Sequence, residues 1–288
     1  MNSVNFIHRF IANELLDCSL SSFIEEMEKG KSTKNRLLQL KQRLPLAKQA
    51  AIALKWVHNN SWVHKDIKPS NYVIKRPTDP TKEPTCKLTD LGYAKAMQVG
   101  KGYTTLTTQL GSFSYTAPEL TVITDKESVH FKMEHDVWAL GCVLHEILTG
   151  LHPFGNPKDV PQTGMNIRIG KKTENAIEEL SEVNNYITSD KLGVTELINK
   201  MISLTASQRP TMEEVVNEMS KWKLNEISYE PSVSSTLKNV NKRRNKAVED
   251  DNPDVSSTWG YLMICTVVSG CMFIFIKKIF VKKNLQIT

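Results

Sequence analysis

Two short polar segments contain the residues whose types and spacing could do chemistry. The first, VHKDIKPSN, holds His64, Asp66, Lys68 and Asn71, and the second, TDLG, holds Asp90. Carboxylate and amide oxygens are ligands that Mg²⁺ prefers, and a lysine neutralises the charge of a phosphate. Phosphoryl transfer consists mainly of positioning and charge neutralisation, so it needs this combination of a carboxylate, metal ligands and a cation.

Short strands must position these two segments. A long core helix is predicted from Leu37 to His58, where Leu, Ala, Ile and Trp recur three and four residues apart. Two strands follow, around Asn71 to Ile74 and Cys86 to Thr89, separated by the proline-rich connection RPTDPTKEP. The polar residues therefore lie at the tips of neighbouring strands.

The rest of the N-terminal two hundred or so residues is expected to be mainly helical. A strand is predicted from Arg9 to Leu16 and a short helix in SLSSFIEEMEKG, whereas Gly92 to Thr116 lacks periodicity and is predicted to be a long loop. The segment HDVWALGCVLHEILTG is apolar on all sides, which predicts a central helix with Asp136 as its cap and Gly150 as its stop. Amphipathic helices are predicted in VTELINKMISL and TMEEVVNEMSKW.

Several further motifs occur in a fixed order along the chain: GSFSYTAPE, then DVWALGCVLHEILTGLHPF, then SQRPT. Together with the first two segments, they resemble a eukaryotic protein kinase of the serine/threonine type over roughly residues 9 to 222. The resemblance implies an α+β fold, mainly α-helical, that corresponds to the kinase C-terminal lobe. No GxGxxG or VAIK-like segment precedes the catalytic motif, so we expect the N-terminal lobe to be largely missing.

The resemblance also implies roles for individual residues. Asp66 corresponds to the catalytic base, and Lys68 to the residue near the transferring phosphate. Asn71 and Asp90 correspond to the ligands of Mg²⁺, which accompanies ATP. The residues expected to contact ATP are, in chain order, Glu14, Leu16, Lys68, Ser70, Asn71, Val73 and Asp90, with Glu14 to Leu16 as the hinge and Val73 beneath the adenine.

Other matched residues are implied to be architectural. Glu119 and Arg209 correspond to a buried ion pair, and Asp136 to the residue that holds the backbone of the catalytic loop. Leu91 stands where the family has a Phe and is expected to pack as an apolar residue. Lys65 replaces the usual Arg, and because Lys lacks a planar bidentate fork, we expect weakened control by phosphorylation. Candidate phosphorylation sites in the following loop are Thr104, Thr105, Thr107, Thr108 and Ser114.

The resemblance leaves two functions open. The first is a protein serine/threonine kinase that transfers the ATP γ-phosphate to a protein substrate, with a kinase dimer or a partner chain supplying N-lobe contacts. The second is a catalytically dead pseudokinase that acts as a scaffold or a partner-binding module. Within the family, ANELLDCSLSSFI, HPFG and NIRIG look most like the kinase-endoribonuclease sensors of the endoplasmic-reticulum unfolded-protein response, but we expect no nuclease domain here.

Composition excludes some other classes of protein. The net charge of +6 is modest and no basic stripe with interleaved aromatic residues is present, so nucleic acid is not an expected partner. The five cysteines form no CxxC pair and have no His at metal-ligand spacing, which argues against a structural metal and for a reducing cytosolic compartment.

The C-terminal part of the chain changes character twice. Residues 1–222 form the predicted kinase-like domain, and the polar residues 223–258 are predicted to be a disordered linker. The uncharged run Trp259 to Ile276 is predicted to be a transmembrane helix, followed by a basic tail over 277–288. We therefore expect a tail-anchored protein with its kinase body in the cytosol, at the endoplasmic reticulum in preference to the mitochondrial outer membrane.

Overall fold

The chain forms two compact units, Met1–Glu230 and Pro231–Thr288. The computed structural model describes residues 16–29, 36–79, 82–98, 100–105, 112–121 and 130–225, together with the backbone of 259–268 and 271–280. The strand predicted over Arg9 to Leu16 lies outside the described residues, apart from Leu16 itself.

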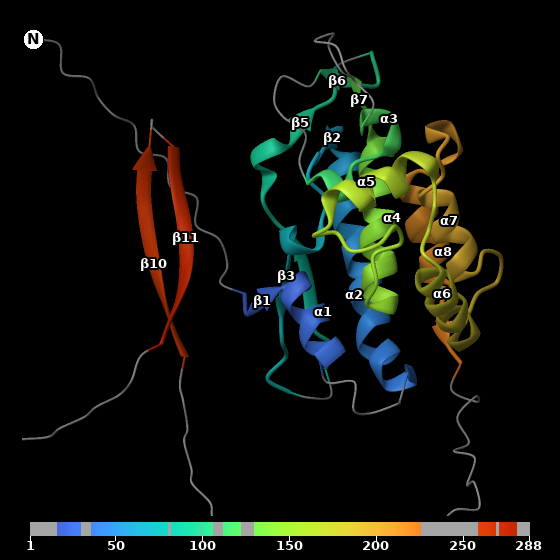
Figure 1. The fold of residues 1–288 in the computed structure, drawn as a ribbon, viewed down its shortest axis with the longest axis horizontal. Coiled ribbons are helices and arrows are strands. Elements are labelled where there is room, and N and C mark those ends of the chain that lie inside the picture. Colours follow the sequence, from blue (N-terminus) through green and yellow to red (C-terminus); the bar gives the residue numbers. More distant parts are fainter. Residues whose placement is uncertain are drawn as a thin grey trace, which may run out of the picture. The chain divides into compact units, whose positions relative to one another are not determined.

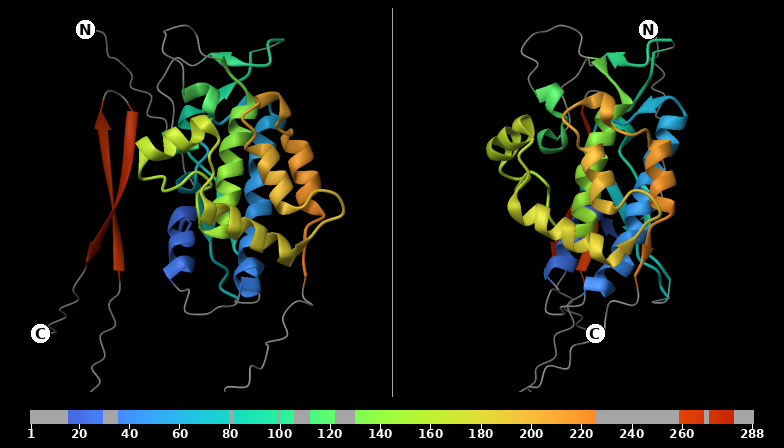
Figure 2. Two further views of the ribbon diagram at one scale, coloured as in Figure 1. Left: turned by 45° about the vertical axis from the view of Figure 1, so that its right-hand side comes forward. Right: turned by 90° about the vertical axis from the view of Figure 1, so that its right-hand side faces the viewer.

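The first unit is built mainly of helices (Figure 1). Their bounds are α1 Leu20–Lys29, α2 Arg36–Asn59, α3 Pro118–Thr121, α4 Met133–Thr149, α5 Val160–Ile169, α6 Glu174–Tyr186, α7 Val194–Met201 and α8 Met212–Ser220. Both views of Figure 2 show α2 (blue) and α4 (green) side by side, and α2 also contacts α8 while α4 contacts α7. The mainly helical fold expected from the sequence is confirmed.

Small sheets complete the first unit. Their strands are β1 Cys18–Ser19, β2 Trp62–Val63, β3 Tyr72–Lys75, β4 Thr85–Leu88, β5 Lys95–Ala96, β6 Thr104–Thr105, β7 His130–Phe131, β8 Ile187–Thr188 and β9 Lys223–Leu224. One antiparallel sheet has the order β1-β3-β4, and the other strands pair as β2 with β5, β6 with β7, and β8 with β9. The two predicted strands that follow the catalytic motif are therefore confirmed as β3 and β4.

Helix α4 is the centre of the core. Of its 17 residues, 14 are buried, as the apolar pattern on all its sides predicted. It ends at Gly150, which has φ 83° and so takes the left-handed conformation that glycine tolerates best. The expected cap was wrong, because α4 begins at Met133 and Asp136 lies inside its first turn.

The second unit contains a two-stranded antiparallel sheet of β10 (Trp259–Val268) and β11 (Cys271–Phe280), in register from Trp259 opposite Phe280 to Val268 opposite Cys271. The prediction of a helix over Trp259 to Ile276 was therefore wrong. The run is rich in β-branched and aromatic residues, which favour strands, and glycines weaken a helix. Among the residues that the structure describes, no helix has the length and apolar character needed to cross a membrane.

Candidate active site

The catalytic loop runs from β2 through the short 3₁₀ helix Pro69–Asn71 into β3, and α4 holds its start. The Asp136 side chain is 1% exposed, and its two oxygens accept hydrogen bonds from the amides of His64 (2.7 Å) and Lys65 (2.9 Å). The His58 ring lies 3.1 Å from the same carboxylate through Nε2. These bonds hold Lys65 at φ 70°, a strained conformation for a residue with a side chain. The predicted role of Asp136 is confirmed.

Asp66 is held from three directions. Its Oδ2 accepts hydrogen bonds from Lys68 Nζ (2.7 Å) and Asn71 Nδ2 (2.9 Å), and its Oδ1 accepts from the amide of Ser112 (3.1 Å). Burial raises the pKa of this carboxyl, but the bonds from Lys68, Ser112 and Asn71 outweigh burial and lower the pKa below its ordinary value. Asp66 is therefore an oriented carboxylate at neutral pH.

Main-chain hydrogen bonds join the catalytic loop to the segment that carries Asp90. The amide of Thr89 donates to the carbonyl of Asn71 (2.8 Å), and His64 Nε2 lies 3.0 Å from the Thr89 carbonyl. The amide of Asp66 lies 3.4 Å from His64 Nδ1, so the imidazole proton belongs on Nε2. His64 thus positions both predicted segments.

The oxygens of Asn71 and Asp90 fit a magnesium site. The Asn71 amide nitrogen donates to the Asp66 backbone and side chain, which leaves its carbonyl oxygen Oδ1 to serve as a ligand. Asp90 is exposed, with φ 61°, and its Oδ1 accepts from the Gly92 amide at 3.3 Å. Mg²⁺ typically takes one or two carboxylates together with substrate phosphates and water. Consistently, the described residues contain no group of three or more His, Cys, Asp or Glu that could hold a metal alone.

The residues predicted to contact the nucleotide lie on both sides of β3. Tyr72 and Ile74 are fully buried, so the half-buried Val73 between them faces the opposite side of the strand. The amide of Asp17, next to Leu16, donates to the Ile74 carbonyl at 2.9 Å and brings the hinge segment beside β3.

Two of the remaining nucleotide predictions and the packing of Leu91 have different outcomes. Ser70 is exposed in the 3₁₀ helix that follows Lys68, whereas Glu14 lies outside the described residues. The expectation that Leu91 packs as an apolar residue was wrong for the described structure, because its side chain is 57% exposed. Asp90 and Leu91 therefore form an open edge of the site.

The ion pair of Glu119 and Arg209 is confirmed. It is bidentate, with Nη1 to Oε1 at 2.7 Å and Nη2 to Oε2 at 2.8 Å, and the guanidinium also lies 5.0 Å from the centre of the Trp138 ring. Burial raises the pKa of Glu119, but hydrogen bonds from His135 and Arg209 and the charge of Arg209 lower it to about 2. The pair joins α3, beyond the catalytic loop, to the segment before α8.

The structure separates the candidate phosphorylation sites. Thr104 is fully buried, and buried Ser114 donates its hydroxyl to the Pro157 carbonyl at 2.8 Å. Thr105 is half-buried and its carbonyl accepts from Lys95 Nζ at 3.0 Å, whereas Thr107 and Thr108 lie outside the described residues. Burial and the nearby charge of Lys95 lower the pKa of Lys65, so two lysines lie close together near this segment.

A hollow of about 1170 Å³ adjoins the catalytic loop and has room for an extended peptide. Its lining includes Lys68 and Ser70, residues of α1, Ser112 to Tyr115, and Glu146 of α4. Burial raises the pKa of Glu146 to about 8, although a hydrogen bond with Tyr115 opposes the effect. The Oε1 atom of Glu146 is buried without a hydrogen-bond partner.

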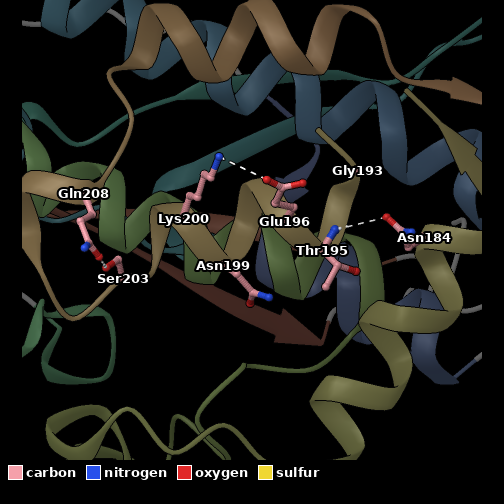
Figure 3. Close-up of a pocket in the computed structure, with 8 residues that line it drawn as sticks. All are labelled: Asn184, Gly193, Thr195, Glu196, Asn199, Lys200, Ser203 and Gln208. Carbon is pink, nitrogen blue, oxygen red and sulfur yellow. Dashed lines mark hydrogen bonds and ion pairs between the residues drawn. The ribbon is translucent and has the colours of Figure 1, made fainter. Parts of the chain in front are cut away.

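A second hollow, of about 850 Å³, lies along α7 (Figure 3) and carries no residue of the catalytic loop. Its polar groups largely bond one another: Lys200 pairs with Glu196 at 3.2 Å, and the amide of Thr195 donates to Asn184 Oδ1 at 3.4 Å. The chemistry therefore belongs to the first hollow.

Two contributors to the site were missed by the sequence reasoning. The Ser112 contribution is a backbone amide, which every residue except proline has, so the sequence carried no signal for it. His58 is a buried residue at the end of α2, and a histidine there gives no sign that it contacts a carboxylate 78 positions later.

Comparisons with known proteins agree with this geometry. The model of the protein kinase domain matches residues 5–220. The probable serine/threonine-protein kinase irlB of Dictyostelium discoideum is 28% identical over 276 residues, which cover 90% of this chain and 18% of that protein. The serine/threonine-protein kinase/endoribonuclease ire-1 of Caenorhabditis elegans is 28% identical, over 74% of this chain and 20% of that protein. The ER sensor for unfolded proteins, ire1, of Schizosaccharomyces pombe is 26% identical, over the same two shares.

This chain thus spans about a fifth of the length of these relatives. The kinase-domain model, in contrast, matches well over half of the 288 residues and includes the whole catalytic loop, the Asp90 segment and the ion pair of Glu119 with Arg209. On these grounds, the chain belongs to the protein kinase family.

Proposed function

We propose that this chain transfers the γ-phosphate of ATP to serine or threonine hydroxyls of a protein substrate, with Asp66 as the catalytic base. The observation that carries the proposal is the buried Asp66 carboxylate, which Lys68, Asn71 and the Ser112 amide hold in one orientation. Its lowered pKa keeps it ionised at neutral pH, as a group that accepts a hydroxyl proton must be.

Each residue contributes a separate part of the reaction. Asp66 orients the substrate hydroxyl and takes its proton, while Lys68, whose Nζ lies 2.7 Å from Asp66 Oδ2, offers its charge to the transferring phosphate. Asn71 Oδ1 and the Asp90 carboxylate would hold magnesium, which neutralises charge on the ATP phosphates when it is bound. The hollow beside Lys68 and Ser70 is where we place the substrate peptide.

Exchange of the base tests the proposal. Asp66→Asn keeps the shape of the side chain but removes the proton acceptor, so phosphate transfer from labelled ATP to a protein substrate should fall about 10²- to 10⁴-fold. Asp190→Asn, which makes the same change in an exposed loop, should leave the rate unchanged. ATP-dependent phosphorylation that survives Asp66→Asn would show that the activity comes from elsewhere.

The alternative is a pseudokinase scaffold, and one observation favours it. Leu91 and Asp90 are both exposed, so no described residue packs over the loop that must orient the Asp90 carboxylate. A scaffold of this kind would bind partners without turning over ATP. Isothermal titration calorimetry with Mg-ATP, followed by measurement of ADP release, decides between the two: micromolar binding with turnover excludes the scaffold.

We also propose attachment to a membrane, at the endoplasmic reticulum, and a place in stress signalling. The support is the uncharged run from Trp259 to Ile276 and the similarity to a protein described as a sensor for unfolded proteins in that organelle. Extraction of cell membranes with alkaline carbonate tests the first part, because a membrane-inserted chain stays in the pellet. Release into the supernatant would end the proposal of an anchor.

A further inference from the structure

A groove of about 990 Å³ lies between the solvent face of α2, the connection from β3 to β4, and the end of the first unit at β9. Its lining residues are Phe23, Leu38, Lys41, Gln42, Leu44, Pro45, Lys48, Arg76, Pro77, Lys82, Glu83, Pro84, Trp222, Lys223 and Leu224. It shares no lining residue with the hollow beside the catalytic loop, so it is a separate feature of the kinase body.

The charge of this groove is strongly biased. Five of its lining residues are cationic, Lys41, Lys48, Lys82, Lys223 and Arg76, and only Glu83 among them is acidic. Arg76 is paired with Glu26, outside the groove, so the four lysines supply the excess of positive charge. Such a concentration of one sign attracts anionic groups and selects against cationic ones.

The floor of the groove is apolar. Phe23, Leu44 and Trp222 are at most 7% exposed, whereas Leu38 at one end is 54% exposed. An apolar floor with a charged rim is the usual construction of a groove that accepts a peptide, since apolar anchors give affinity and the rim gives selectivity.

Lys48 places a cation on the floor rather than on the rim. Its Nζ donates to the Trp222 carbonyl at 2.8 Å, which uses one of its three donors. Burial lowers the pKa of Lys48, although the charge of Glu83 opposes the effect. An ammonium held there gains from a further anionic acceptor, which a bound carboxylate would supply.

The wall formed by the β3–β4 connection is fixed in place. Gln49 of α2 donates to the Pro84 carbonyl at 3.0 Å and accepts from the Cys86 amide at 2.7 Å. At the other end, the Arg76 guanidinium lies 5.3 Å from the centre of the Phe23 ring. The groove is therefore preformed, which lowers the entropic cost of binding.

We propose that this groove is a docking site for an acidic segment of a partner protein, bound as an extended peptide with carboxylates on the lysines and apolar side chains on the floor. A single-stranded nucleic acid would need exposed aromatic rings for base stacking, and the aromatic residues here, Phe23 and Trp222, are buried. A membrane surface is flat, whereas Lys48 lies on the floor of a recess, where headgroups reach it poorly.

Fluorescence anisotropy on the full chain tests the proposal. The probe is a labelled twelve-residue peptide of glutamate and leucine, and the comparison peptides replace its glutamates by lysine or its leucines by serine. We expect the acidic, leucine-bearing peptide to bind more tightly than either comparison peptide, by about tenfold or more, and the binding to weaken as salt is raised.

Charge reversal places the binding in the groove. The double variant Lys82→Glu with Lys223→Glu should weaken binding of the acidic peptide by about tenfold or more. The double variant Lys101→Glu with Lys171→Glu makes the same change of net charge at exposed positions outside the groove and should leave the affinity within about twofold.

Three outcomes would overturn the proposal. Equal affinity of the two charge-reversal variants would place the binding elsewhere. Equal affinity for the acidic and lysine peptides would remove the basis in charge, and this comparison needs no variant. Tighter binding of phosphatidylserine vesicles or of single-stranded RNA, lost in the groove variant, would assign the surface to another kind of partner. Because none of these readouts requires ATP, their failure is distinguishable from the loss of kinase activity.

Discussion

Buried carboxylates serve three different purposes in this molecule. Asp66 is held by donors that keep it ionised and oriented, Asp136 fixes the backbone of the catalytic loop through the amides of His64 and Lys65, and Glu119 pairs with a cation. Each has enough donors to offset the loss of water. Glu146 differs, because burial raises its pKa and one of its oxygens has no partner, so this group is the least stable in its ionised form.

The pair of Glu119 with Arg209 predicts how stability depends on pH. In the folded chain the pKa of Glu119 is about 2, below its ordinary value of 4.5, so the unfolded chain binds more protons between these two values. The stabilisation is therefore fully present above about pH 4.5 and is lost as the pH falls toward 2. Glu119→Gln should lower the free energy of unfolding at neutral pH by about 2 kcal/mol, less than for a fully buried pair because the side chain is 32% exposed.

Urea unfolding at several pH values measures this effect. The difference between Glu119→Gln and the parent chain should shrink as the pH falls below about 4.5. Glu196→Gln removes an exposed pair with Lys200 and should change the free energy of unfolding by no more than about 0.5 kcal/mol. A difference that is the same at every pH would contradict the assigned role of the Glu119 charge.

At the scale of elements, the end of α4 makes a second prediction. Gly150 has φ 83°, and a Cβ at this position would overlap the Glu28 carboxylate, which binds buried Arg43 at 2.5 Å. Gly150→Ala therefore adds backbone strain and displaces Glu28 from its partner. We expect a loss of about 2 to 4 kcal/mol in the free energy of unfolding, of which strain accounts for about 1 to 2.

Gly100 provides the matched control for this substitution. Its φ is 74°, but a Cβ there would meet no atom within 4 Å, so Gly100→Ala reports the backbone strain alone. The two variants are compared by the midpoints of thermal or urea unfolding. If both lower the stability equally, the contact between position 150 and Glu28 contributes nothing.

How far the sequence predicted these elements depended on the kind of signal. Periodicity over a long segment located α2, and the lack of polar residues on any side located α4 in the core. An uncharged run such as Trp259 to Ile276 has no such period, so its length suggested a helix, whereas its β-branched and aromatic residues form the strands β10 and β11.

The candidate site was predictable where side chains do the work. The spacing from Asp66 to Asn71, and then to Asp90, was enough to identify the catalytic set. The amide of Ser112 and the exposure of Leu91 depend on how distant segments meet, which spacing along the chain does not encode. The same limit explains why Asp136 was predicted correctly as a partner of the catalytic loop and wrongly as a helix cap.

At the scale of the whole molecule, α2 connects most parts of the kinase body. It contacts α4, α8 and β4, supplies His58 to the catalytic loop, and forms one wall of the basic groove. The body also continues beyond residue 222, where the linker was predicted to begin, because β9 pairs with β8 and ends the described chain beside α2. Catalytic loop and groove thus share one rigid helix.

Trp222 closes the body at this end. Its side chain is 1% exposed, its Nε1 donates to the Leu192 carbonyl at 3.1 Å, and its own carbonyl accepts from Lys48. Trp222→Ala leaves a large cavity and an unpaired carbonyl, so the free energy of unfolding should fall by about 3 to 5 kcal/mol in urea titrations of the full chain. Trp56→Ala is the matched control: that side chain is 66% exposed, and its removal should cost no more than about 0.5 kcal/mol. Equal costs for the two tryptophans would mean that the last turn of the chain is not part of the cooperative core, and that the kinase body ends before β9.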